Sequence, residues 1–119
     1  MDVKFTMKNR CLIAKPVGEM DHHTCERIRM RIDREYDEQG ALHIIMDLKG
    51  IDFMDSSGIG LIMGRYRKAA MMGGKVILVH VSDKLDRVFA MAGLYKILKK
   101  ATDIKEAAAA LTGAEGGRS

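Results

Sequence analysis

The sequence contains no tryptophan and few aromatic residues of any kind: Phe and Tyr make up 5% of its 119 residues, and there is one proline. Without large rings, the core must be built from aliphatic side chains and from many of the ten methionines. A chain of this length forms one domain, and a hydrophobic content of 47% is enough to fill one core. We therefore expect a single, aliphatic and methionine-rich domain.

Long apolar runs are also missing. No stretch of about 18 apolar residues occurs, so we expect no membrane-spanning helix. Residues 1–4 lack the apolar segment of a secretory signal. The two cysteines, Cys11 and Cys25, stand far apart rather than as a Cys-x-x-Cys pair. Their placement favours reduced core residues over a disulfide or a metal site. These features predict a cytoplasmic protein that does not bind a membrane.

Charge is distributed unevenly along the chain. The net formal charge is +4, but residues 19–55 hold 5 basic and 10 acidic residues, whereas residues 65–100 hold 9 and 2. The balances of −5 and +7 predict a surface with two electrostatic faces. The basic residues are scattered and lack an aromatic stacking platform, so we do not expect nucleic acid as a partner. A partner that meets the acidic part should bring arginine or lysine.

Hydrophobic periodicity and capping residues predict a hairpin followed by alternating helices and strands. Asp21 and Ser82 are expected to cap two of the helices, and Asp103 with Glu106 has capping-box spacing. The expected strands are 2–8, 11–17, 42–48, 76–81 and a short edge strand at 95–98. The expected helices are 21–39, 56–72, 83–92 and 103–111.

This order of elements predicts an α/β fold with a mixed sheet of four or five strands and about four helices. Residues 1–112 should form the domain and residues 113–119 a frayed tail. The pattern does not fix the strand order. In the second helix, the expected apolar stripe consists of Ile59, Ile62, Met63, Tyr66 and Ala70.

The most informative segment is Phe53-Met54-Asp55-Ser56-Ser57-Gly58-Ile59-Gly60, which joins an expected buried strand to the second helix. It places Ser56 and Ser57 where a helix has unpaired N–H groups and the positive end of its dipole, a setting that suits a phosphate. The plain alternative is ordinary capping chemistry at a helix boundary. We interpret Ser56 as a phosphorylation switch rather than as a catalytic nucleophile.

Three glycines inside the same expected helix, Gly58, Gly60 and Gly64, require an explanation, because each costs about 1 kcal/mol relative to alanine. Gly58 and Gly60 would leave the helix start open, so that the serines are accessible to a partner. Alternatively, Gly60 and Gly64 share a face and would allow tight packing of the helix on the sheet. The sequence leaves both uses open.

Patterns typical of enzymes are incomplete. Met54 occupies the position of the first glycine in a Gly-x-Ser-x-Gly nucleophile elbow around Ser56. His43 and His80 fall on expected strands, and His22 and His23 are consecutive, so that they point about 100° apart and suit a metal poorly. There is no Gly-Lys-Ser/Thr phosphate loop. We therefore expect a binding protein and not an enzyme.

Several segments together resemble the STAS domain of bacterial anti-sigma factor antagonists, and in particular the sporulation branch that controls sigma-F. The resemblance covers about residues 2–111, and Ile59 departs from it by replacing the usual leucine. The segments are Gly18-Glu19-Met20-Asp21-His22-His23-Thr24, Phe53-Met54-Asp55-Ser56-Ser57-Gly58-Ile59-Gly60, Gly64-Arg65-Tyr66-Arg67 and Ala92-Gly93-Leu94-Tyr95-Lys96-Ile97.

The resemblance implies that the unmodified protein binds an anti-sigma factor that is a serine kinase, and thereby frees the sigma factor. The kinase would phosphorylate Ser56, and a serine phosphatase would reverse the reaction. ATP and the divalent metal would belong to these two partners, so this chain needs no cofactor. The implied partner surface consists of Asp21, Asp55, Ser57, Gly58, Ile59 and Gly60. The alternative is a generic STAS module that senses nucleotide or acts as a scaffold in a stress-signalling complex.

Overall fold

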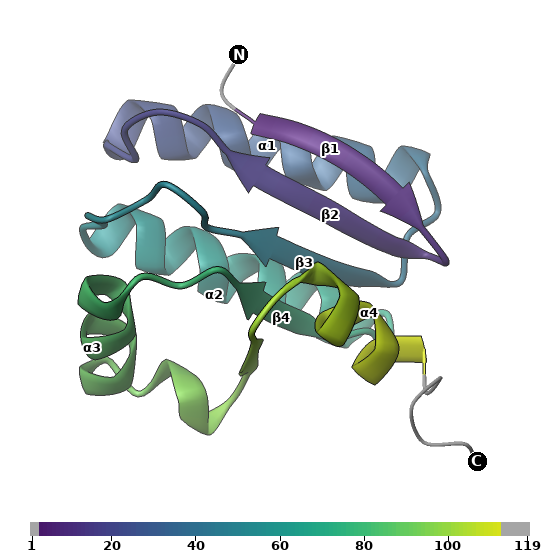
Figure 1. Cartoon of the computed structure of the whole chain (residues 1–119). Helices are drawn as coiled ribbons and strands as arrows, with labels where there is room; N and C mark the ends of the chain where they lie inside the picture. Colours follow the sequence, from purple (N-terminus) through teal and green to yellow (C-terminus); the bar gives the residue numbers. More distant parts are fainter. Residues whose placement is uncertain (1–2, 113–119) are drawn as a thin grey trace.

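The computed structural model describes residues 3–112 and shows a five-stranded sheet with helices on both faces (Figure 1). The expected tail at 113–119 lies outside the described residues. In chain order the elements are β1 (Val3–Lys8), β2 (Cys11–Pro16), α1 (His22–Glu38), β3 (His43–Asp47), α2 (Ser56–Met71), β4 (Val76–Val79), α3 (Asp83–Met91), a 3₁₀ turn η1 (Leu94–Lys96), β5 (Lys99–Ala101) and α4 (Ile104–Thr112).

The sheet is mixed, as the sequence predicted, and its strands lie in the order β1-β2-β3-β4-β5. β1 and β2 pair antiparallel, whereas all the other neighbours pair parallel. Asn9 and Arg10 form the two-residue hairpin turn with φ values of 52° and 65°. A turn with both central residues left-handed matches the twist of the two strands that it joins.

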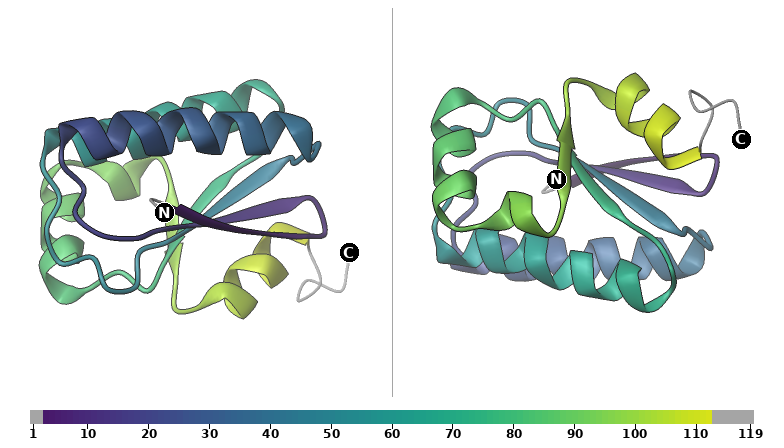
Figure 2. Two further views of the ribbon diagram at one scale, coloured as in Figure 1. Left: turned by 90° about the horizontal axis from the view of Figure 1, so that it is seen from above. Right: turned by 90° about the horizontal axis from the view of Figure 1, so that it is seen from below.

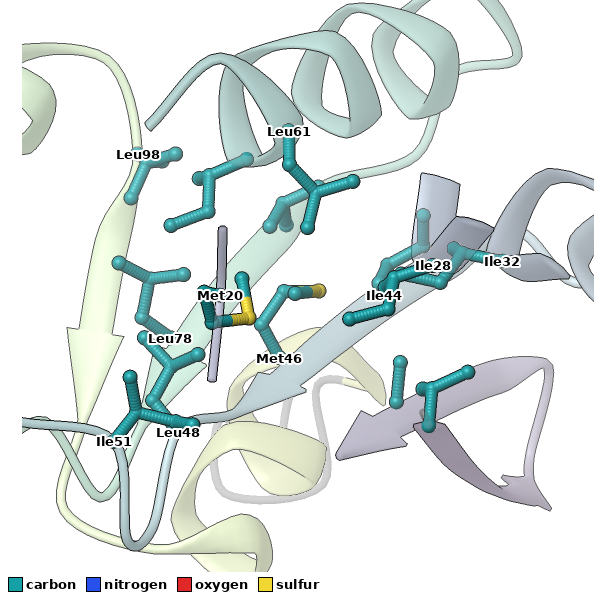
Figure 3. Packing of buried hydrophobic residues seen from close by; sticks show 14 of the residues in the cluster. Met20, Ile28, Ile32, Ile44, Met46, Leu48, Ile51, Leu61, Leu78 and Leu98 are labelled. Carbon is teal, nitrogen blue, oxygen red and sulfur yellow. The ribbon is translucent and has the colours of Figure 1, made fainter. Parts of the chain in front are cut away.

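The helices divide between the two faces of the sheet (Figure 2): α1 and α2 lie side by side on one face, α4 covers the other, and α3 lies at one end. Ile44, Met46 and Leu78 point into the larger apolar cluster under α1 and α2, which Figure 3 shows in detail. Ile45 and Ile77 alternate with them and point into the smaller cluster under α4. The apolar run in β3 is therefore buried on both sides, as expected for a covered parallel strand.

The predicted helix caps are confirmed. The Asp21 carboxylate accepts a hydrogen bond from the Thr24 amide at 2.8 Å, and the Ser82 hydroxyl accepts one from the Leu85 amide at 3.2 Å. Asp103 accepts from the Glu106 amide at 2.8 Å. Because α1 follows β2 and α2 follows the adjacent parallel strand β3, these two helices begin at the same edge of the sheet.

Two predicted strand positions were wrong. Residues 95–98, expected as an edge strand, form the end of the 3₁₀ turn η1 and the bend after it, and the strand that pairs with β4 is the next segment, β5. β4 ends at Val79, so His80 is not on a strand. His80 has a φ of 57°, which breaks the extended backbone, and its Nδ1 lies 2.8 Å from the buried Asp47 carboxylate.

The predicted buried stripe of α2 was also wrong in part. The helix buries Leu61 and Ile62 together with Gly58, Arg65 and Ala69, whereas Ile59, Met63 and Tyr66 are half-buried and Ala70 is exposed. The buried face is therefore displaced toward a glycine and an arginine. Neither residue contributes to a hydrophobic pattern, which explains the error.

Candidate functional site

The loops at the carboxyl edge of the sheet enclose a pocket of about 360 Å³. One wall comes from residues 18–21, before α1, and the other from residues 50–55, before α2. Four of the lining side chains are carboxylates: Glu19, Asp21, Asp52 and Asp55. We call this feature the acidic pocket. Its charge favours cationic groups on any partner that covers it.

Ser56 is the first residue of α2, next to the acidic pocket, and is exposed. No hydrogen bond links its hydroxyl to any residue in the range 3–112. Asp55 caps the helix, because its Oδ1 accepts hydrogen bonds from the Ser57 amide at 2.9 Å and from the Gly58 amide at 3.4 Å. The Ser56 hydroxyl is therefore free to react or to contact a partner.

Ser57 differs from Ser56 in its surroundings. It is half-buried, and its Oγ lies 3.3 Å from Nδ1 of His22, the first residue of α1. The ring of His23 meets the His22 ring edge-on at 5.8 Å between centroids. His22 thus links the start of α1 to the start of α2, and His23 packs against its ring. No sequence pattern indicates the contact between His22 and Ser57, because 35 residues separate them.

The two capping carboxylates, Asp21 and Asp55, lie close enough to act on the same neighbouring thiol. Hydrogen bonds from the Thr24 backbone and side chain hold the pKa of Asp21 below its ordinary value. Burial raises the pKa of the nearby Cys25 thiol, and the negative charges of Asp55 and Asp21 raise it further. The structure therefore brings Asp21 and Asp55 together at one site, although they lie far apart in the sequence.

The structure separates the two roles that the sequence left open for the glycines of α2: Gly60 is exposed and leaves the helix start open, whereas Gly58 is buried. Gly60 and Gly64 do not serve tight packing on the sheet, since a Cβ at either position would meet no atom within 4 Å. Gly58 is the closely packed one: a Cβ there would lie 2.1 Å from Cγ of the buried Met54. Ile59 is half-buried and packs against the main core, so only part of it faces outward.

A second hollow, of about 340 Å³, lies between α1 and α2; its lining includes Ser57 and shares no residue with the acidic pocket. Three arginines line it: Arg29, Arg65 and Arg67. Arg65 is 6% exposed, and its Nε lies 2.9 Å from Oδ1 of Asp33 on α1. We call this feature the arginine groove. Sequence reasoning missed it because nothing in the pattern links Asp33 to Arg65.

Residues 3–112 form no metal-binding cluster and no membrane-spanning helix. In this range, no group of three or more His, Cys, Asp and Glu side chains could hold a metal ion. Cys11 and Cys25 are free and buried, as predicted. Over the same residues, no helix combines the length and the apolar character that crossing a bilayer demands.

Comparison with known proteins agrees with this geometry. The model of the STAS domain matches residues 2–107. The chain is 40% identical over 87 residues to the anti-sigma F factor antagonist of Paenibacillus polymyxa, covering 73% of this chain and 74% of that protein.

Solved structures are similar as well. The anti-sigma factor antagonist SpoIIAA in its unphosphorylated form superposes with a TM-score of 0.80 at 33% identity, covering 93% of this chain and 96% of that one. The Bacillus cell fate determinant SpoIIAA in its phosphorylated form gives 0.69 at 31% identity, covering 87% and 95%. The matched family model, the identity to an antagonist and the shared fold lead to one conclusion: the chain belongs to the STAS domain family, together with the anti-sigma factor antagonists.

Proposed function

We propose that this protein is an anti-sigma factor antagonist controlled by phosphorylation of Ser56. In its unmodified form it binds an anti-sigma factor that is also a serine kinase, and so releases the sporulation sigma factor sigma-F. Phosphorylation by the bound kinase ends the interaction, and a serine phosphatase restores it. The chain acts by binding rather than by catalysis, in the cytoplasm, and holds no cofactor of its own.

The observation that carries this proposal is the exposed, unbonded hydroxyl of Ser56 beside the acidic pocket. A kinase can reach the hydroxyl, and arginine or lysine side chains of the same partner can pair with the carboxylates. Asp21, Asp55, Ser57 and Gly60 are the surrounding residues that we assign to the partner surface, with Gly58 and Ile59 supporting them from below. The relatives support the assignment, since one is described as an anti-sigma F factor antagonist and one is known in a phosphorylated form.

The switch follows from the charge of the phosphate. A phosphoserine carries about −1.5 to −2 charges at neutral pH. A partner carboxylate about 4 Å away would repel each unit of that charge by on the order of 4 kcal/mol at an effective dielectric near 20. Even a third of this repulsion weakens binding about tenfold. Removing the phosphate from water on docking costs still more.

The test uses the full chain and the anti-sigma F kinase from the same organism. With ATP and Mg²⁺, mass spectrometry should find one phosphate, on Ser56. Calorimetry should show that Ser56→Ala binds the kinase as the unmodified chain does, whereas Ser56→Asp binds at least about tenfold more weakly.

A matched control shows whether the effect depends on where the negative charge is added. Gln39→Glu adds one negative charge at the C-terminal end of α1, far from the sheet edge where Ser56 lies. It should bind as tightly as the unmodified chain. Phosphate that appears elsewhere than on Ser56, or equal losses for Ser56→Asp and Gln39→Glu, would contradict the proposal.

A further inference from the structure

The arginine groove is an open hollow bordered by two parallel helices. On α2 its lining includes Ser57, Gly60 and Gly64, and on α1 it includes His22 and Arg29. Gly60 and Gly64 lie about one turn apart, and the space in front of both is empty. The absence of two side chains at these positions is therefore what leaves the groove open.

The charges around the groove do not balance. Arg29 pairs with Glu26 and lies 3.6 Å from an oxygen of Asp33, the same carboxylate that pairs with Arg65. Arg67 is exposed and forms no ion pair with another residue of the range 3–112. Two guanidinium groups, those of Arg29 and Arg65, thus share two carboxylates, and the charge of Arg67 is left over as a net positive charge.

Arg65 has donor capacity that the protein does not use. Its Nη1 is buried and has no hydrogen-bond partner, and its Nε, although close to Asp33, is not aligned for a hydrogen bond. Burial lowers the pKa of Arg65, and the nearby Asp33 opposes this effect. Oδ1 of Asp33 is likewise buried without a hydrogen-bond partner, so the Arg65–Asp33 pair holds unused donors and an unused acceptor side by side. Buried polar atoms without partners are rare in folded proteins, and a small turn of the Arg65 guanidinium toward the groove would give Nη1 an acceptor on a bound ligand.

We propose that the arginine groove binds a small anion of the phosphate type. Guanidinium groups present paired donors that match two oxygens of a phosphate, and the Ser57 hydroxyl can donate at the end of the groove. A volume of about 340 Å³ suits a small ligand. Glu26 at the rim would repel an extended acidic segment, whereas a compact anion can sit nearer to Arg65 and Arg67. This site is separate from Ser56 and does not depend on its modification.

The test is an NMR titration of the full chain with sodium phosphate and with sodium pyrophosphate, each compared with sodium chloride at matched ionic strength. We expect saturable shifts confined to the amides of residues 22–29 and 57–67. Shifts that do not saturate, or that are spread over lysines outside the groove, would show unspecific charge screening and overturn the proposal.

Variants provide the sharper comparison. Arg67→Gln should weaken phosphate binding by about three- to tenfold, because it removes one of the charged donors. Arg34→Gln removes the same charge from an exposed position on α1 outside the groove and should have no effect. Equal losses in the two variants would overturn the assignment.

A larger side chain placed in the groove tests whether phosphate binds there. Gly64→Leu should abolish phosphate binding, whereas Gly64→Ala, which adds only a methyl group in open space, should retain it. Amide spectra confirm that each variant is folded. Unchanged binding by Gly64→Leu would overturn the proposal, as would a glutamate-rich peptide that binds the same amides more tightly than phosphate does.

Discussion

Two glycines on α2 should respond in opposite ways to the same substitution. Gly58 and Gly60 lie two residues apart in α2, and alanine favours a helix by about 1 kcal/mol over glycine. At Gly60 a new Cβ meets no atom within 4 Å, so Gly60→Ala should stabilise the protein by nearly that amount. At Gly58 the same Cβ would lie 2.1 Å from Cγ and 2.8 Å from Sδ of Met54.

The magnitude follows from this close approach. Carbon atoms in contact prefer separations of about 3.5–4 Å, so Met54 or the helix start must shift by more than about 1 Å. Cγ lies near the base of the Met54 side chain and cannot simply rotate away, as its terminal methyl could. Overpacking of a core costs about 1–3 kcal/mol, from which the helix gain of about 1 kcal/mol is subtracted. Gly58→Ala should therefore destabilise the protein by up to about 2 kcal/mol.

Urea unfolding monitored by circular dichroism measures both variants under identical conditions. The two free energies of unfolding should differ by about 1–3 kcal/mol, with Gly60→Ala the more stable. Met54→Ala alone should cost about 2–5 kcal/mol because Met54 is buried, but adding Gly58→Ala to that variant should recover the alanine gain, since the atoms that clash have been removed. If Gly58→Ala alone is as stable as Gly60→Ala, the close packing of Met54 under the start of α2 is refuted.

Three further predictions concern the switch, the pH dependence and a buried hydroxyl. Phosphorylation of Ser56 should leave the fold intact, so amide spectra should change only near residues 53–62, and widespread shifts would refute this. Burial lowers the pKa of His43, whose Nδ1 accepts a hydrogen bond from the Lys75 amide at 3.0 Å. The unfolded chain then binds the proton more readily, so stability should fall as pH drops below about 6.5 and level off below the folded pKa. His43→Gln should flatten that part of a plot of unfolding free energy against pH, and an unchanged slope would contradict the assignment. Tyr36→Phe removes the hydrogen bond donated to the Leu42 carbonyl at 2.6 Å and should cost about 1 kcal/mol in urea unfolding, whereas an unaltered midpoint would show that water replaces it.

Much of the fold could be predicted because its signals are local. A cap such as Asp21 acts on an amide three residues away, and the buried face of α1 follows from the spacing of Cys25, Ile28, Ile32 and Tyr36. The hairpin is equally local, since it depends on the turn at Asn9 and Arg10. Each of these features is fixed by residues within one or two turns of the chain.

The errors came from long-range interactions. Arg65 is buried because Asp33 of another helix pairs with it, and no pattern within α2 indicates that partner. β5 has the sequence Lys99-Lys100-Ala101, which is a strand only because β4 supplies hydrogen bonds along its edge. The acidic pocket could be inferred only through resemblance to known proteins, because the parallel pairing of β2 and β3 is what brings its two walls together.

This geometry explains why a phosphate on Ser56 should act on binding and not on folding. In the free protein, the start of α2 favours the phosphate by about 0.3–1 kcal/mol, while Asp55 and Asp21 repel it through water. In water such repulsion is at most about 1 kcal/mol per unit charge at 4 Å, so the opposing effects are of similar size and nearly cancel. A docked partner excludes that water and lowers the effective dielectric, which multiplies the repulsion about fourfold, to on the order of 4 kcal/mol. The same change strengthens the attraction of the helix start, but Asp21 and Asp55 both repel the phosphate and its desolvation adds to the cost, so the phosphate becomes unfavourable only when the interface forms.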